Sequence, residues 1–572
     1  MNGQSHKSGR IFFLYLVLSI VLTWPLAVNL TRYPLFDRLD IGMTILNFWW
    51  QYYALFHFHA DPWFHSLVNY PDGFSLVFFP LYLAYGVLSF PFQFLFGSPG
   101  AIPGFFNWIS ILSFAFTGFL AFLICKKLVN SAASAFIAGI LFTFLPFHYW
   151  HLPRCHASCL ELVLLPIYCY LRLLEDKTRK TAIVFGLSLV PLFYQSPNYL
   201  VYVSLFLGLS LLYLLVADRK MLDRKWLGSV ALAALIAITL ALPFLLEAGK
   251  EIIRQTTPAT NTVDTQVLFS ANPVGMVLPG PNQKLYGSLG RLGENLIAGH
   301  GLTGKEIFPG YLLLVTGVFG IFLARRRVKF FGFWVLVFLF FLIMSLGPFL
   351  DLAGKTFYRF PLPFYLLQKI FPVFLMDRSP GRMTVFAYFA LAVFSAAGFA
   401  WIGGRLKGGK RIAVFAAIGV FALLELNQAP LSMGRIELPK LYREIAREPG
   451  EFSVLDLPLL PDIYRFSGYF QIFHKKGIVV APKKGEVTSE DQPLFYYFDE
   501  PGRFFLLAPE KQESEQGRIA AELKRRRVKY VIVYLKFVDA EKREHMDQLL
   551  ERLGPVRVFN SENLFSVYQF AY

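Results

Sequence analysis

Cysteine is scarce in this chain, with four thiols among 572 residues: Cys125, Cys155, Cys159 and Cys169. No CxxC pair and no histidine-rich metal signature occurs. Cys155 and Cys159 are one helical turn apart, which is a poor geometry for a disulfide. We therefore expect four free thiols, and nothing in the cysteine pattern indicates a redox protein or a structural zinc site.

Acidic residues are also few, since 38 Asp and Glu face 55 Lys and Arg and leave a formal charge of +17. The cations form short clusters between apolar runs, which is typical of cytoplasmic membrane loops. No basic stripe with interleaved aromatics stands apart from the apolar runs, so nucleic acid is not an expected partner.

Apolar residues dominate, at 55% of the chain with a mean hydropathy of +0.48. No run shows the alternation of barrel strands, and only helices otherwise satisfy the backbone inside lipid. We expect the first run to be a retained helix, because no small-residue cleavage site follows it. The apolar runs are 11–30, 76–97, 104–125, 131–147, 159–174, 181–195, 199–217, 227–246, 309–323, 330–349, 383–402 and 412–427.

The basic clusters predict the topology. They are Lys7/Arg10, Lys126/Lys127, Lys177/Arg179/Lys180, Arg219/Lys220/Arg224/Lys225, Arg325/Arg326/Arg327/Lys329 and Arg405/Lys407/Lys410/Arg411. All of them are cytoplasmic if the run 76–97, which contains Pro80, Gly86 and Pro91, does not cross. We therefore predict about eleven spans, a cytoplasmic N-terminus and an extracytoplasmic C-terminus in the plasma (inner) membrane. The alternative is twelve spans with one displaced lysine pair.

The predicted fold class is a polytopic α-helical membrane protein with a small C-terminal α/β domain. The membrane domain would span 1–428, with outer loops 31–103, 247–308 and 350–382, and the outer α/β domain 429–572. In the latter, helices are expected near 438–447, in GRIAAELKRRR and in KREHMDQLLERL, with strands in FSVLDL and KYVIVYL and a closing hairpin. No glycine-rich phosphate loop or nucleophile elbow occurs there, so we interpret it as a lid or recognition module. The chain has no internal repeat of the kind that transporters show.

Candidate chemical residues lie in the predicted outer loops. Asp37 and Asp40 follow the first helix and precede an aromatic amphipathic stretch, where a carboxylate can serve as a base or be an ordinary solvated loop residue. The loop FHYWHLPRCHASCLE gathers five polar side chains that suit a cavity lining, or a metal although the spacing matches no standard zinc pattern. These five are His148, His151, Arg154, His156 and Glu161. In FLMDRSPGRM, Arg378 and Arg382 can clasp a phosphate or anchor a helix end.

These residues, in this order, resemble the GT-C superfamily of integral-membrane glycosyltransferases, most of all its uncharacterised prokaryotic members. The matching stretches are LDIGMTILNFWW, NYPDGFSL, FLICKKLVNSAASAFIAGILFTFLPFHYWHL, ANPVGMVLPGPNQKLYG, KEIFPGYLLL, SLGPFL and MDRSPGRM, spread over about residues 40–400. The chain departs from the family pattern in two ways. The usual acidic pair is split as Asp37 and Asp40, and only Glu161 fits the second acidic position.

The resemblance implies an inverting transferase of the cell envelope that moves a hexose or pentose from a polyprenyl-phosphate sugar to a glycan, lipid or protein acceptor. Asp40 would be the base, and Arg378, Arg382 and Lys284 would bind the donor phosphate. A divalent cation such as Mg²⁺ or Mn²⁺ is a candidate cofactor. The alternative is a non-catalytic membrane protein that binds or translocates a lipid-linked glycan.

Two expectations concern the arrangement of these outer loops. We expect Asp40 and Arg378 to line one outer cavity. We also expect the loop 247–308 to fold over that cavity with Lys284 and Glu306 facing inward, because it carries the apolar stretch VLFSANPVGMVLP.

Overall fold

The computed structural model divides the chain into two compact units. The helical unit contains Met1–Phe36, Tyr82–Tyr85 and Pro103–Gly434, and the mixed unit contains Asp37–Leu81, Gly86–Ile102 and Arg435–Tyr572. The described residues are 2–34, 38–79, 81–253, 261–280, 283–296, 307–323, 325–434, 438–480, 488–489, 492–561 and 564–571. Most of the first long loop thus groups with the C-terminal segment. The predicted division at residue 428 instead places that loop in the membrane domain.

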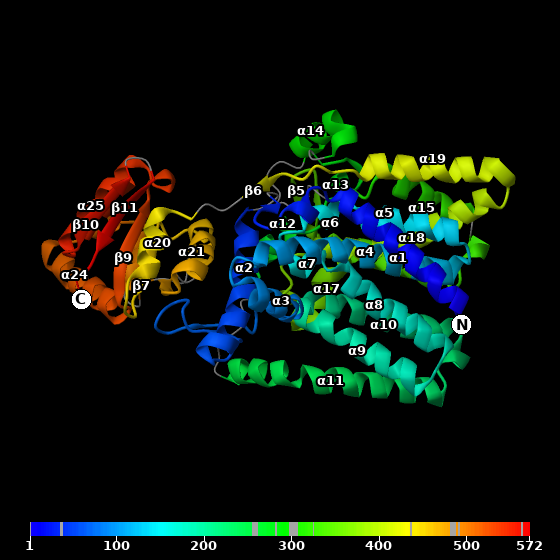
Figure 1. Ribbon diagram of the computed structural model, residues 1–572, viewed down its shortest axis with the longest axis horizontal. Coiled ribbons are helices and arrows are strands. Elements are labelled where there is room, and N and C mark those ends of the chain that lie inside the picture. The colour runs from blue at the N-terminus through cyan, green and yellow to red at the C-terminus, as the bar shows by residue number, and fades with distance from the viewer. Residues whose placement is uncertain are drawn as a thin grey trace. The chain divides into compact units, whose positions relative to one another are not determined.

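Every apolar run of the sequence contains a helix (Figure 1). The long helices of the helical unit are α1 (Asn2–Leu22), α4 (Ile102–Val129), α5 (Ala132–Thr143), α8 (Leu160–Glu175), α9 (Arg179–Gln195), α10 (Pro197–Ala217), α11 (Arg224–Ile253), α15 (Tyr311–Leu323), α16 (Phe331–Ser345), α18 (Thr384–Gly403) and α19 (Gly408–Leu426). Its short helices are α6 (Pro146–Trp150), α7 (Cys155–Ser158), α12 (Val263–Leu268), α13 (Pro273–Val277), α14 (Gly287–Leu296) and α17 (Pro363–Ile370). Two small antiparallel pairs complete it: β1 (Tyr33–Pro34) with β6 (Met433–Gly434), and β4 (Phe349–Leu352) with β5 (Lys355–Pro361).

Six helical segments of the described chain are long and apolar enough to cross a membrane, judged by length and composition. They are Ile102–Val129, Ala132–Trp150, Cys155–Glu175, Pro197–Ala217, Arg224–Ile253 and Pro380–Gly403. Helix α3 (Leu83–Phe96), in the run predicted not to cross, has 14 residues and contains Pro91. At about 1.5 Å per residue it reaches roughly 21 Å, short of a ~30 Å hydrocarbon core. Since α15 and α16 are equally short, length alone does not fix the number of spans, which stays a prediction.

Helix α18 is the buried centre of the helical unit, whereas α11 exposes an apolar face that suits lipid. Glycines bring α15 close to α18. A Cβ atom at Gly320 would lie 2.0 Å from the carbonyl oxygen of Phe394, and one at Gly317 would lie 2.9 Å from Leu391. Close backbone packing of this kind is how helices associate without a hydrophobic drive in lipid.

The mixed unit is built on a five-stranded sheet of order β10–β11–β9–β7–β8, in which β7 runs parallel to both neighbours and the hairpin is antiparallel. Its strands are β7 (Ser453–Leu457), β8 (Gly477–Val479), β9 (Val528–Tyr534), β10 (Val556–Ser561) and β11 (Phe565–Gln569), with the small pair β2 (Phe64–His65) and β3 (Phe74–Ser75). Its other helices are α2 (Arg38–Tyr53), α20 (Lys440–Arg447), α21 (Pro461–His474), α22 (Pro493–Asp499), α23 (Gly502–Phe505), α24 (Pro509–Arg525) and α25 (Ala540–Arg552).

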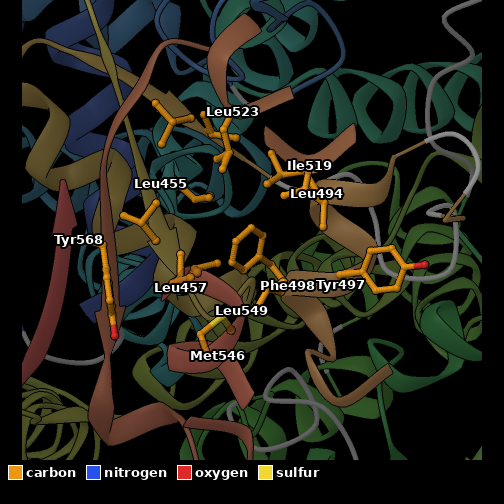
Figure 2. Packing of buried hydrophobic residues seen from close by; sticks show 14 of the residues in the cluster. Leu455, Leu457, Leu494, Tyr497, Phe498, Ile519, Leu523, Met546, Leu549 and Tyr568 are labelled. Atoms are coloured by element: carbon orange, nitrogen blue, oxygen red, sulfur yellow. The ribbon is translucent and has the colours of Figure 1, made fainter. Parts of the chain in front are cut away.

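The core of this unit lies between the sheet and helices α22, α24 and α25. Figure 2 shows Leu455 and Leu457 of β7 gathered with Phe498 of α22 and Leu549 of α25. The strands and helices that the sequence predicts after residue 437 are present, with α24 beginning earlier than GRIAAELKRRR. Helix α21 and strand β8 have no counterpart in the sequence prediction.

Candidate functional site

Two of the histidines singled out by the sequence are placed by the turn that follows α5. Pro146 starts α6, and the Nδ1 atom of His148 lies 2.9 Å from the carbonyl oxygen of Thr143. The ring of His148 stacks on Phe114 with centroids 3.7 Å apart, so this side chain is a packed core residue. His151 follows one turn later, with its Nδ1 atom 2.8 Å from the carbonyl oxygen of Phe147.

Four of the predicted residues come together in the helical unit. The guanidinium groups of Arg154 and Arg382 both interact electrostatically with the rings of His151 and His156. Burial first, and then these two positive charges, lower the pKa of His151 well below its usual value, so its ring is neutral at neutral pH. We call Arg154, His151, His156 and Arg382 the cationic cluster.

Three polar atoms of the cationic cluster are buried. Within the described part of the chain, His151 Nε2, His156 Nδ1 and Arg382 Nε have no hydrogen-bond partner. Buried polar groups in proteins are nearly always satisfied, and an unsatisfied one costs free energy. The two guanidinium groups therefore suit an anion that accepts several hydrogen bonds. Neutral His151 donates Nδ1–H to the Phe147 carbonyl, so its Nε2 atom suits a hydroxyl donor rather than the anion itself.

Asp377 is a buried carboxylate beside this cluster that the sequence does not single out. It accepts hydrogen bonds from the hydroxyl of Tyr202 and from the backbone N–H of Ser379, the latter at 3.0 Å. Burial raises the pKa of Asp377, while these bonds and the charge of Arg382 act in the opposite direction. The sequence does contain a signal for it, because Asp377 lies between the apolar residues FLM and Arg378 in FLMDRSPGRM.

Glu161 lies in α8 and is also buried. Its carboxylate accepts hydrogen bonds from the hydroxyls of Tyr85 and Ser113, and Ser113 is also 3.2 Å from the carbonyl oxygen of Ser158. These contacts tie α8 to α4 and to residue 85 inside the helical unit. Glu161 is therefore a packed polar residue under the loop that carries the histidines.

The other two predicted phosphate ligands are on the surface. Arg378 is exposed, with its guanidinium group 4.3 Å from the ring centroid of Phe269. Lys284 is exposed and donates to the carbonyl oxygen of Ala429. The loop of Arg378 packs tightly on residues 269–271, since Gly381 N donates to the Phe269 carbonyl at 3.2 Å. Asp37 and Glu306 lie outside the described residues.

Asp40 belongs to the mixed unit, in the first turn of α2. Its Oδ1 atom is 3.4 Å from a terminal nitrogen of Arg465 in α21, and both side chains are largely buried, at 19% and 29% exposure. The sequence gives no indication of this partner, because Arg465 lies in the C-terminal segment.

The described residues contain no group of three or more His, Cys, Asp or Glu side chains arranged to hold a metal ion. All four cysteines are buried free thiols.

A family model described as "Domain of unknown function (DUF6311)" matches residues 12–424, which is most of the chain. This chain belongs to that family. No curated protein matches it significantly.

Three solved structures are similar to this chain at low sequence identity. The apo oligosaccharyltransferase of Archaeoglobus fulgidus matches with a TM-score of 0.53 and 13% identity, over 92% of this chain and 70% of that chain. AglB from the same organism, in complex with an inhibitory peptide and a dolichol-phosphate, gives 0.48 and 13%, over 99% and 74%. ArnT from Cupriavidus metallidurans in the apo state gives 0.48 and 11%, over 99% and 98%. The first likeness shows the fold, so this member of the DUF6311 family has the GT-C fold that its motifs predict.

Proposed function

We propose that this protein transfers a sugar from a polyprenyl-phosphate donor to an acceptor at the outer membrane face, and that its cationic cluster holds the donor phosphate. The observation that carries the proposal is the cluster itself. Two guanidinium groups and two imidazoles converge in a GT-C fold, and three of their buried polar atoms lack a partner among the described residues.

The chemistry of the donor fits this set of groups. A polyprenyl-phosphate sugar is a phosphodiester with one negative charge, and its cleavage leaves a lipid phosphate with a second charge. Arginine forks bind phosphate oxygens in a planar, bidentate manner and stabilise charge as it develops. Neutral His151 donates its Nδ1 proton to the carbonyl oxygen of Phe147, so its Nε2 atom is left as a hydrogen-bond acceptor.

Asp40 is the proposed base. The acceptor hydroxyl attacks the anomeric carbon, its proton passes to the Asp40 carboxylate, and the bond from that carbon to the phosphate oxygen breaks with inversion. A hexose or pentose as the sugar, a divalent cation as a cofactor, and Arg378 and Lys284 as further phosphate ligands stay predictions from the family resemblance.

Binding of the lipid phosphate tests the cluster without knowledge of the sugar. Full-length protein in nanodiscs would be titrated with polyprenyl phosphate and with the matching polyprenyl alcohol. We expect the phosphate to bind at least tenfold more tightly, and Arg382→Gln to remove most of that difference, because a charge-assisted contact contributes about 1.5–3 kcal/mol. Arg359→Gln is the matched control, since Arg359 is exposed on β5.

Equal affinity for the phosphate and the alcohol, or unchanged discrimination in Arg382→Gln, would refute the phosphate site. Transfer is measured with a panel of polyprenyl-phosphate sugars. Asp40→Asn should abolish transfer and leave phosphate binding intact, whereas a glycan binder or translocator would be little affected by that change.

A further inference from the structure

The start of the first long loop is packed against the C-terminal segment through two helices, α2 and α21 (Figure 1). Glycines on both helices make the approach close. A Cβ atom at Gly42 would lie 3.2 Å from the carbonyl oxygen of Arg465, and one at Gly468 would lie 2.9 Å from Leu46. Such contacts leave little freedom for one helix to shift along the other.

The middle of the same loop is fixed to the sheet beside β8. The backbone N–H of Ile478 donates to the carbonyl of Leu67 at 2.8 Å, and the N–H of Tyr70 donates back to Ile478 at 3.1 Å. Asp72 then accepts two bonds from the guanidinium group of Arg525, at 2.7 and 3.0 Å. The loop is therefore held in the mixed unit at two places, by helix packing at its start and by hydrogen bonds at its middle.

Helix α21 is itself anchored on both sides. The hydroxyl of Ser467 donates to the buried carboxylate of Asp456 in β7, and the side-chain amide of Gln471 donates to the carbonyl of Leu67 at 2.8 Å. Arg465 lies on this anchored helix and faces Asp40 at 3.4 Å. Two titratable neighbours on α21 are Tyr464, which interacts electrostatically with Arg465, and Tyr469, whose Cβ lies next to Gly42.

We infer that Arg465 is a positioning residue for Asp40, so that the C-terminal segment completes the catalytic carboxylate. This inference rests on the proposed function. A guanidinium group beside a carboxylate favours its ionised form and restricts its rotation, because the planar fork holds one oxygen in place. The base would then be held in one orientation, unlike a solvated loop aspartate.

The pairing is tested first without any activity, by a double-mutant cycle on the full-length protein in nanodiscs. Melting temperatures are compared for the wild type, Asp40→Asn, Arg465→Gln and the double variant. We expect the effect of Arg465→Gln to be smaller when residue 40 is already Asn, since the partner charge has gone. Arg443→Gln, exposed on α20 of the same unit, is the control and should add independently to Asp40→Asn. Additive effects of Arg465→Gln and Asp40→Asn would overturn the inference.

The positioning role is tested by the pH dependence of transfer. Arg465→Gln should move the acid limb of the kcat profile upward by about half a pH unit or more and lower kcat several-fold at pH 6, with an unchanged KM for the donor. Arg465→Lys should recover most of the rate. If the melting temperatures show coupling but Arg465→Gln keeps the wild-type pH profile, the pair contributes only to stability and the positioning role is overturned. A wild type that binds polyprenyl phosphate but transfers no sugar would instead remove the proposed function, with the positioning role falling alongside it.

Discussion

The carboxyl of Asp456 should make the stability of the mixed unit depend on pH. It is buried at the end of β7 and accepts bonds from Ser467 and from Tyr442, the latter at 2.7 Å. Burial raises the pKa of Asp456 to about 6 from an ordinary 3.8, although both hydroxyl bonds favour the charged form. The folded state therefore holds this proton more tightly than the unfolded chain does.

A raised pKa in the folded state adds stability below the unfolded value and loses it as the pH rises through the folded value. Two pKa units correspond to about 3 kcal/mol in total. As the pH rises from 5 to 7.5, the loss of the Asp456 proton lowers the free energy of unfolding by about 1.4 kcal/mol, which is roughly tenfold in the opening equilibrium.

Hydrogen exchange of the full-length protein, followed at the amides of β7 and β9 and corrected for the intrinsic rate, measures that opening. The Asp456 carboxyl should make the protection factors of these amides about tenfold higher at pH 5 than at pH 7.5 in the wild type. Asp456→Asn should lack this tenfold difference. Tyr442→Phe removes a bond that favours the charged carboxylate and so raises the folded-state pKa of Asp456, and its loss of protection should continue to higher pH. An Asp456→Asn variant with the same pH dependence as the wild type would refute the reasoning.

Three further outcomes follow from the helical unit. Gly320→Ala should lower the melting temperature by many degrees, because its Cβ would lie 2.0 Å from the carbonyl oxygen of Phe394, whereas Gly419→Ala, with nothing within 4 Å, should be neutral or slightly stabilising. Glu425→Ala should cost about 1–3 kcal/mol, since the Glu425 carboxylate accepts the N–H of Tyr311 at 2.7 Å at the start of α15; Glu425→Gln, which keeps an acceptor, should cost less. The predicted topology requires an active alkaline phosphatase fused at the C-terminus in a bacterial host, and an active cytoplasmic reporter there would reject it.

The helices were predictable because apolar runs depend only on local sequence. Each run contains a helix, and the strands FSVLDL and KYVIVYL form the parallel pair β7 and β9. The sequence pattern does not predict segments whose structure depends on tertiary contacts. The loop at Leu67–Asp72 joins the sheet through Ile478 and Arg525, and no periodicity connects residues so distant in sequence.

The candidate site was predictable only in part, for the same reason. Residue type and motif order led to His151, Arg154, His156 and Arg382, which the structure brings together. His148 shared their short loop, but stacking on Phe114 makes it a core residue. Spacing in one loop cannot tell which ring turns inward to pack.

Asp377 of the helical unit and Asp40 of the mixed unit are carboxylates in different environments. Asp377 is deeply buried, and its pKa is raised by that burial. Its two oxygens already accept bonds from the Tyr202 hydroxyl and the Ser379 N–H, so this carboxyl group is suited to hold Tyr202 in place rather than to receive a proton from an acceptor. Asp40 keeps 19% of its side chain exposed, begins a helix and lies 3.4 Å from a guanidinium nitrogen of Arg465, so this carboxylate is both oriented and within reach of an acceptor. These environments favour Asp40 over Asp377 as the base of the proposed reaction.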